Sequence, residues 1–151
     1  MFDLEERRAL VTGATGGIGA SIVSMLHMQG ATVVLSGSRE ETLREQVDTL
    51  GSRAHAVPCD LRNPGTVESL LTDSIGLMGG IDILVHCAGI TRDNIFMRMS
   101  DEEWQSVIDV NMTATMKLCK GVLRGMMKAR WGRIINISSV VGATGNPGQA
   151  N

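Results

Sequence analysis

Several residue types are scarce in this sequence of 151 residues, and each scarcity excludes a class of protein. There is no tyrosine, and aromatic residues make up 3% of the chain. The three cysteines, Cys59, Cys87 and Cys119, are odd in number and far apart, so we expect no disulfide framework, no metal site and a cytoplasmic location. No apolar run approaches the roughly 20 residues that span a bilayer, so we do not expect this to be a membrane protein.

The net charge is also small, because 14 Lys and Arg face 16 Asp and Glu, which gives −2. This balance gives no electrostatic reason to expect a nucleic-acid or membrane partner. The acidic first residues, 1–6, differ from the basic start of a signal peptide. With 43% hydrophobic and 20% charged residues, the composition is that of one globular domain.

Short apolar runs alternate along the chain with amphipathic segments. The runs predict strands at residues 8–12, 32–36, 54–59, 81–86 and 133–138. The segments predict helices at 18–29, 40–50, 64–78 and 101–130, the last as two pieces that meet near Asn111. This alternation indicates one doubly wound α/β domain over 1–151, a Rossmann-like parallel sheet of order 3-2-1-4-5. Because the fifth strand would be an uncovered apolar edge, we expect a truncated domain that lacks its C-terminal strands.

The turn after the first strand is rich in glycine. Gly13, Gly17 and Gly19 follow that strand directly and open the first helix. Glycines permit a tight turn and a close backbone approach, and the N-terminus of the helix offers N–H groups to a pyrophosphate. The pattern therefore predicts a dinucleotide site. The alternative is a turn that only packs the strand on the helix.

The end of the second strand indicates which dinucleotide is bound. An NAD site would place an acid here to accept from the ribose 2′-hydroxyl, whereas this chain has Ser38 and Arg39. A guanidinium and a hydroxyl suit a 2′-phosphate, so we expect NADP(H). The alternative is a solvated Arg39 that is engaged by Glu40 and Glu41.

Five motifs, in order, resemble the short-chain dehydrogenase/reductase family. They are Thr12-Gly-x-x-x-Gly-x-Gly19, Asp60, Cys87-Ala-Gly-Ile90, Asn111 and Ile137-Ser-Ser139. Segments 89–94, 97–99, 101–104, 132–135 and 139–151 resemble, more narrowly, bacterial 3-oxoacyl-[acyl-carrier-protein] reductases. The resemblance implies the NADPH-dependent reduction of a 3-oxoacyl thioester, held on acyl carrier protein, to the 3-hydroxyacyl form in fatty acid biosynthesis.

The resemblance also implies roles for individual residues. Ser139 would polarise the substrate carbonyl, Asn111 would hold a water of a proton relay, and Asp60 would contact the adenine edge. The cofactor-binding residues would be Gly13, Thr15, Gly17, Ile18, Gly19, Ser38, Arg39, Asp60, Leu61, Cys87, Ala88 and Gly89. Judged without the family, Asp60 is equally a helix cap before Pro64, Asn111 a buried amide or helix kink, and Ser139 a turn former.

The sequence departs from the family at the glycine turn and after the fourth strand. His86 and Cys87 stand where relatives usually have two asparagines, so Cys87 replaces an amide that ties neighbouring loops together. We expect His86 to be a packed imidazole at the end of its strand. Gly16 stands where many relatives carry arginine, which places more weight on Arg39 as the ligand of a 2′-phosphate.

The proton donor of the family is a tyrosine assisted by a lysine four residues later, and its position would directly follow Asn151. We therefore expect the 151-residue polypeptide alone to have no reductase activity, and to fold poorly or to associate through its fifth strand. The alternatives are a catalytically dead NADP-binding fragment or sensor, and another short-chain reductase such as an acetoacetyl-CoA reductase.

The last long helix suggests partners. Lys128, Arg130 and Arg133 are expected near the active-site side, and Arg130 matches a family position implicated in docking the acidic carrier protein. Alternatively, these charges complement a helix C-terminus. Relatives use such helices in a tetramer, so we expect the complete protein to be a homotetramer. The helix has more apolar residues than one sheet face needs, namely Met112, Met116, Leu118, Val122, Leu123 and Met126.

Overall fold

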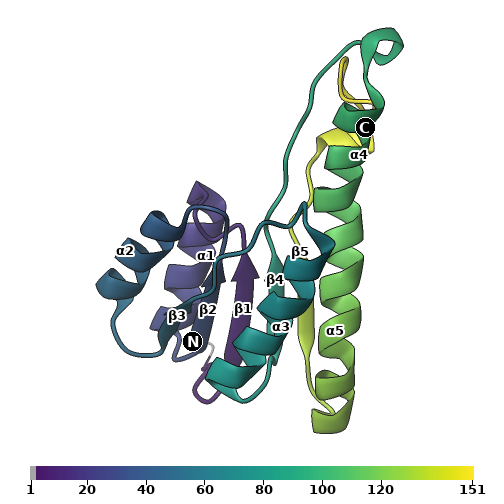
Figure 1. The fold of residues 1–151 in the computed structure, drawn as a ribbon. Helices are drawn as coiled ribbons and strands as arrows, with labels where there is room; N and C mark the ends of the chain where they lie inside the picture. The colour runs from purple at the N-terminus through teal and green to yellow at the C-terminus, as the bar shows by residue number, and fades with distance from the viewer. Residues whose placement is uncertain (1–2) are drawn as a thin grey trace.

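A parallel sheet of five strands organises the computed structural model, which describes residues 3–151 (Figure 1). The strand order is β3-β2-β1-β4-β5, with parallel pairing throughout, which confirms the predicted topology. The strands are β1 (Arg8–Thr12), β2 (Thr32–Ser36), β3 (Ala54–Ala56), β4 (Ile83–His86) and β5 (Arg133–Asn136).

Helices follow the strands at nearly the predicted positions. They are α1 (Gly17–Met28), α2 (Glu40–Leu50), α3 (Pro64–Met78), α4 (Asp101–Ile108), α5 (Ala114–Ala129) and the short α6 (Val141–Thr144), which was not predicted. A 3-10 turn, η1 (Phe96–Arg98), precedes α4, and a π-helical turn, η2 (Asp109–Thr113), joins α4 to α5. The expected junction near Asn111 is therefore confirmed, and it is a widened turn rather than a break.

The three later strands are shorter than the sequence predicts. After β3, Pro58 has no N–H to donate to a ladder, although the backbone still follows β2 through Val57 N–H to the carbonyl of Leu35 (2.9 Å). β4 begins at Ile83 rather than at Ile81. β5 ends at Asn136, because the chain then turns into the loop before α6.

Two cores lie on opposite faces of the sheet, since successive strand residues point to opposite sides. On one face, β1, β2 and β4 pack against α1 and α2, with the buried side chains Ala9, Val11, Val23, Val33, Leu35, Leu43, Ile83 and Val85. On the other face they pack against α3 and α5, with Leu10, Val34, Val67, Leu70, Leu84, Leu118, Val122 and Met126.

The apolar side chains of α5 divide between this core and the surface. Leu118, Val122 and Met126 are buried against the sheet. The prediction that the helical segment 101–130 has more apolar surface than one sheet face needs is confirmed, because α5 exposes Met116 (53%), Leu123 (46%) and Met127 (74%), and the preceding turn η2 exposes Met112 (60%).

Strand β5 forms the edge of the sheet beside β4 (Figure 1). Its residues are exposed, including Ile134 and Ile135, and Ile137 just after it is also exposed. No helix within residues 3–151 is long and apolar enough to cross a membrane.

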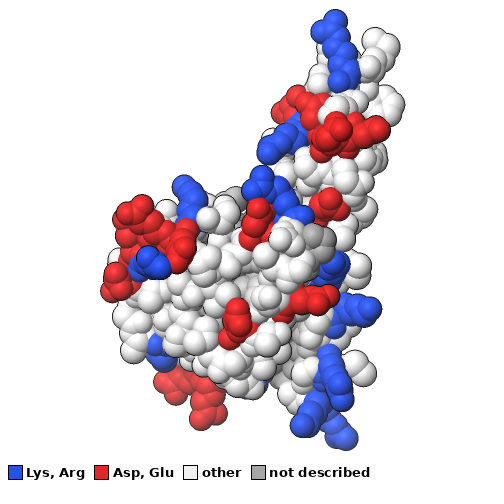
Figure 2. Space-filling view, viewed as in Figure 1, with Lys and Arg blue, Asp and Glu red and all other residues white. Residues whose placement is uncertain are grey.

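The basic residues around the end of α5 lie at the amino ends of the strands, whereas we expected them at the carboxyl ends, where the active site would lie. Arg130 ends α5 and Arg133 begins β5, so both mark the amino ends of the parallel strands. Figure 2 shows basic side chains gathered at this end of α5. Lys128 in the last turn of α5 complements the helix C-terminus. The expectation that these residues cluster near the active-site side is therefore wrong within one chain.

Candidate functional site

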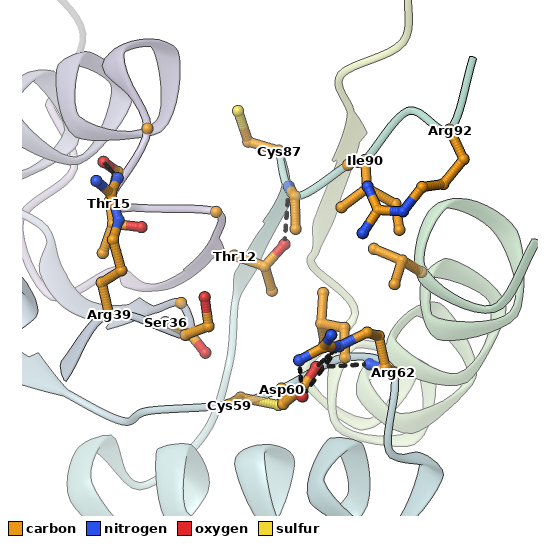
Figure 3. Close-up of a pocket in the computed structure, with 18 residues that line it drawn as sticks. Thr12, Thr15, Ser36, Arg39, Cys59, Asp60, Arg62, Cys87, Ile90 and Arg92 are labelled. Carbon is orange, nitrogen blue, oxygen red and sulfur yellow. Dashed lines mark hydrogen bonds and ion pairs between the residues drawn. The ribbon is translucent and has the colours of Figure 1, made fainter. Parts of the chain in front are cut away.

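A cavity of about 440 Å³ opens at the carboxyl ends of β1, β2 and β4 (Figure 3). In a sheet of this order the crevice between β1 and β4, where the strand order reverses, is the usual ligand site. The predicted residues that line the cavity are Gly13, Thr15, Ser38, Arg39, Asp60, Leu61, Cys87, Ala88 and Gly89. The predicted Gly17, Ile18 and Gly19 form the first turn of α1 instead.

The glycines of the first turn are required for different structural reasons. Gly13 has φ +67°, and a Cβ there would lie 2.6 Å from the main-chain nitrogen of Ala88. At Gly19 a Cβ would lie 2.2 Å from the carbonyl oxygen of Gly13. These two glycines let the turn pack on the loop after β4 and let α1 pack on the turn.

Gly17 is different, because packing does not require it. Within the described residues, and apart from its own helix and chain neighbours, nothing lies within 4 Å of a Cβ placed there. No side chain in the described part of the molecule caps α1, so the N–H groups of its first turn are available to a ligand. The alternative of a turn used only for packing thus fits Gly13 and Gly19 but gives no reason for Gly17.

Thr12 and His86 join the ends of β1 and β4 below the cavity. Their side chains hydrogen-bond, with 2.9 Å between Oγ1 and Nδ1, and the N–H of Ala88 donates to the same hydroxyl at 3.4 Å. Burial lowers the pKa of His86, which is 3% exposed. The imidazole is therefore a packed, neutral group at the end of its strand. Burial also raises the pKa of the neighbouring Cys87 thiol, which keeps it protonated at neutral pH.

Arg39 lies over the glycine-rich turn. Its guanidinium donates to the carbonyl oxygen of Thr15, while Glu40 pairs with Arg44 one turn further along α2. Within residues 3–151 Arg39 forms no ion pair, so the alternative in which Glu40 and Glu41 engage it is not observed. A guanidinium free of carboxylates at the cavity wall suits an anion.

Asp60 pairs with Arg62 instead of capping a helix. Asn63 caps α3, with its Oδ1 accepting from the N–H of Gly65 at 3.0 Å, so the helix-cap interpretation of Asp60 is wrong. Hydrogen bonds from the Arg62 side chain hold the pKa of the Asp60 carboxyl below its ordinary value. The carboxylate is therefore ionised at neutral pH.

Two arginines that were not predicted from the sequence, Arg62 and Arg92, also line the cavity. Each lies a few residues beyond the end of a strand that contributes a predicted site residue, β3 or β4. That position relative to the carboxyl edge of the sheet was the signal that could have identified them.

Asn111 holds the loop after β4. Its Oδ1 accepts from the N–H of Ile90 and its Nδ2 donates to the carbonyl oxygen of Ile90, both at 2.9 Å. Asn111 is exposed and lies within the π-helical turn, so the kink alternative is closer to the observation than a buried amide. Its neighbour Val110 lines the cavity. The water-binding role of Asn111 stays a prediction.

Ser139 lies in the loop between β5 and α6. Its Oγ accepts from the N–H of Val141 at 3.2 Å, as a turn-forming serine does. The hydroxyl hydrogen is not used by that bond, so the side chain can still donate to another oxygen. Its catalytic role stays a prediction.

A doubly wound parallel sheet with this cavity at its carboxyl edge defines a Rossmann-like α/β protein. The sequence profile of the family described as short chain dehydrogenase matches residues 7–151, and the chain belongs to that family. It is 50% identical over 151 residues to nodulation protein G of Rhizobium sp. (strain N33). It is 47% identical over 150 residues to the 3-oxoacyl-[acyl-carrier-protein] reductase FabG of Vibrio cholerae, and 45% identical over 150 residues to that of Escherichia coli (strain K12).

These alignments cover 100%, 99% and 99% of this chain, respectively, and the chain spans 62% of the length of each of the three curated relatives.

Single substitutions test the different roles assigned above to Gly19, which is required for packing, and Gly17, which is not. Gly19→Ala is expected to lower the free energy of unfolding by about 1–3 kcal/mol, because its Cβ forces the backbone at Gly13 to move. Gly17→Ala is the matched control and is expected to leave stability unchanged or raise it by up to about 1 kcal/mol. Urea unfolding followed by circular dichroism measures both, and equal losses would contradict the assignment.

Proposed function

We propose that the protein reduces a 3-oxoacyl thioester to the 3-hydroxyacyl form with NADPH, in fatty acid biosynthesis. The observation that supports this most directly is the cavity at the β1–β4 crevice, with a glycine-rich turn on one side and, beside it, Arg39, which forms no ion pair within residues 3–151. The relatives named as 3-oxoacyl-[acyl-carrier-protein] reductases at 45–47% identity support the reaction class. The name of nodulation protein G specifies no reaction.

The residues present fit a nicotinamide dinucleotide phosphate. The open position at Gly17 and the uncapped N–H groups of α1 would hold the pyrophosphate. Ser38 and Arg39 would hold the 2′-phosphate, and the backbone at Ala88 and Gly89 would lie against a ribose. When bound, the nicotinamide supplies the hydride.

Ser139 and Asn111 complete the proposed machinery within this chain. Ser139 would donate its free hydroxyl hydrogen to the carbonyl oxygen of the substrate, where negative charge develops. Asn111 would hold the loop of Ile90 at the cavity and bind a water for proton supply.

The cofactor preference can be reversed at Arg39. Arg39→Asp is expected to weaken NADPH binding about 10- to 100-fold, because a charge-assisted bond to the 2′-phosphate is lost and a repulsion is introduced. NADH binding is expected to improve or stay unchanged, since a carboxylate can accept from a 2′-hydroxyl. Fluorescence titration with both nucleotides measures the ratio. Arg44→Asp on the exposed side of α2 is the control, and equal losses in both variants would rule out the assignment.

The reaction itself is tested by NADPH oxidation with a 3-oxoacyl thioester. Protein isolated from its own host is expected to turn over, and an intact mass identifies the polypeptide that is assayed. The isolated 151-residue polypeptide is expected to show no turnover, because it contains no tyrosine to protonate the forming alkoxide. Turnover by that polypeptide would contradict this expectation. A preference for a coenzyme A thioester over the carrier-bound substrate would instead favour an acetoacetyl-CoA reductase.

We further propose acyl carrier protein as the substrate carrier and a homotetramer as the assembly. The exposed apolar side of α5 supports subunit contacts. Arg130 lies at the amino ends of the strands, whereas the cavity lies at their carboxyl ends. A carrier docked at Arg130 would therefore serve the cavity of a neighbouring subunit. Light scattering of the protein from its host tests the assembly, and a monomer would contradict it.

Charge reversal at Arg130 tests the docking role. Arg130→Glu is expected to raise the KM for carrier-bound substrate about 10-fold, because an acidic carrier is then repelled. The KM for a small thioester analogue should stay unchanged, and Arg124→Glu on α5 is the comparison variant. An equal rise in KM with both substrates would reject the docking role.

A further inference from the structure

The main chain of Ala14, in the glycine-rich turn, is hydrogen-bonded to both ends of one segment, residues 36–46. Its N–H donates to the carbonyl oxygen of Ser36 at the end of β2, at 3.0 Å. Its carbonyl oxygen accepts from Nε2 of Gln46 in α2, also at 3.0 Å. The segment between these two contacts contains Ser38 and Arg39, which we propose as the ligands of the 2′-phosphate. Ala14 therefore holds both ends of that segment against the turn.

Gln46 lies on the same face of α2 as Arg39, because the two residues are about two helical turns apart. Leu43 lies between them on that face and is fully buried against the sheet. Burial of the leucine turns this face of the helix inward, but apolar contact has no preferred direction. The hydrogen bond from Gln46 is directional, so it also sets the position of α2 relative to the glycine-rich turn.

The amide of Gln46 is oriented by the carbonyl of Ala14. Its Oε1 is buried and accepts no hydrogen bond within residues 3–151. The reverse orientation of the amide would place Oε1 against the Ala14 carbonyl, which is also an acceptor. A buried amide oxygen without a partner carries a desolvation cost that an apolar side chain of the same length would avoid. Packing alone therefore gives no reason for a glutamine at this position, whereas the bond to Ala14 does.

Arg39 itself contacts the next carbonyl along the turn, that of Thr15 (Figure 3). A phosphate would compete with this neutral carbonyl for the guanidinium, since hydrogen bonds between two charged groups are the stronger ones. The bond from Gln46 to Ala14 does not involve the guanidinium, so that competition leaves it intact. It therefore still holds α2 on the turn when Arg39 binds an anion.

We propose that Gln46 is a positioning residue that favours NADPH over NADH, because its bond to Ala14 keeps Arg39 in place for the 2′-phosphate. This rests on the proposed function, since it presupposes NADPH as the cofactor. The pyrophosphate, which both nucleotides contain, would lie at the first turn of α1. The position of that turn depends on the packing of Gly19 on Gly13 rather than on α2. Loss of the Gln46 bond should therefore affect the two nucleotides differently.

Equilibrium titration of the protein from its host with NADPH and with NADH tests this difference. Gln46→Met is expected to weaken NADPH binding about 5-fold, because methionine keeps the length of the side chain but cannot donate to Ala14. NADH binding is expected to stay within about 2-fold of that of the unmodified protein, since NADH has no 2′-phosphate. Thermal unfolding of each variant is measured in parallel, because a general loss of structure would weaken both nucleotides.

Thr49→Met is the matched control for this substitution. Thr49 is a neutral, exposed residue of the same helix, and its hydroxyl donates to the carbonyl oxygen of Glu45 within α2 rather than to the turn. The control variant is expected to bind both nucleotides as the unmodified protein does.

A double-substitution cycle shows whether Gln46 acts through Arg39. Arg39→Met removes the guanidinium without introducing a repulsion, and it is expected to weaken NADPH binding about 10-fold. Adding Gln46→Met to that variant is expected to weaken NADPH by less than about 2-fold more, because no guanidinium remains to be positioned. If the two losses multiply, the residues act independently and the proposal is wrong.

Three further results would overturn the proposal. An unchanged preference for NADPH in Gln46→Met would remove the positioning role while leaving the proposed reductase function intact. Equal weakening of NADPH and NADH would show that the glutamine stabilises the turn as a whole and does not set specificity. If the unmodified protein does not prefer NADPH to NADH, the proposed cofactor fails, and the inference fails with it.

Discussion

The close approach of the first glycine-rich turn to the loop after β4 is the constraint on which the cavity depends. Gly13 lies against the backbone of Ala88 with no space for a side chain, and Gly19 lies against Gly13, also with no space for a side chain. The bond between Thr12 and His86 holds the two strand ends together beneath this contact. The loops can diverge above it because the chain leaves β1 and β4 on opposite sides of the sheet. The cavity is therefore a consequence of the strand order and of two glycines.

The polar side chains of the cavity divide by how their charge is balanced. Asp60 and Arg62 neutralise one another on one wall, whereas Arg39 contacts a main-chain carbonyl on another. The walls of the cavity therefore differ in charge, although the chain as a whole has a net charge of only −2. The dinucleotide phosphate that we propose as the cofactor has a similar division, since its purine is neutral and its phosphates are anionic.

Most of the fold follows from local patterns in the sequence, whereas contacts between loops do not. The strand order and the helix positions are predictable because apolar periodicity and right-handed crossovers leave few alternatives. The position of Arg39 at the cavity followed from the end of its strand, and that of Asp60 from the family resemblance. Their partners did not, because hydrogen bonds to Thr15 and Arg62 depend on loop conformations. The location of Arg130 was mispredicted although the sequence contained the signal, because a residue that precedes β5 lies at the amino end of a parallel strand, opposite the carboxyl ends that form the cavity.

The π-helical turn between α4 and α5 connects the helix layer to the cavity. The N–H of Ala114 donates to the carbonyl of Asp109, five residues earlier, so the turn contains one residue more than an α-helical hydrogen bond would enclose. Such π-helical turns are rare, occur mostly as single turns within α-helices, and are frequent at functional sites. Here the amide of Asn111 makes both of its bonds to Ile90, a lining residue. The irregular turn is thus stabilised by the same contact that positions the loop, which couples the helix junction to the shape of the cavity.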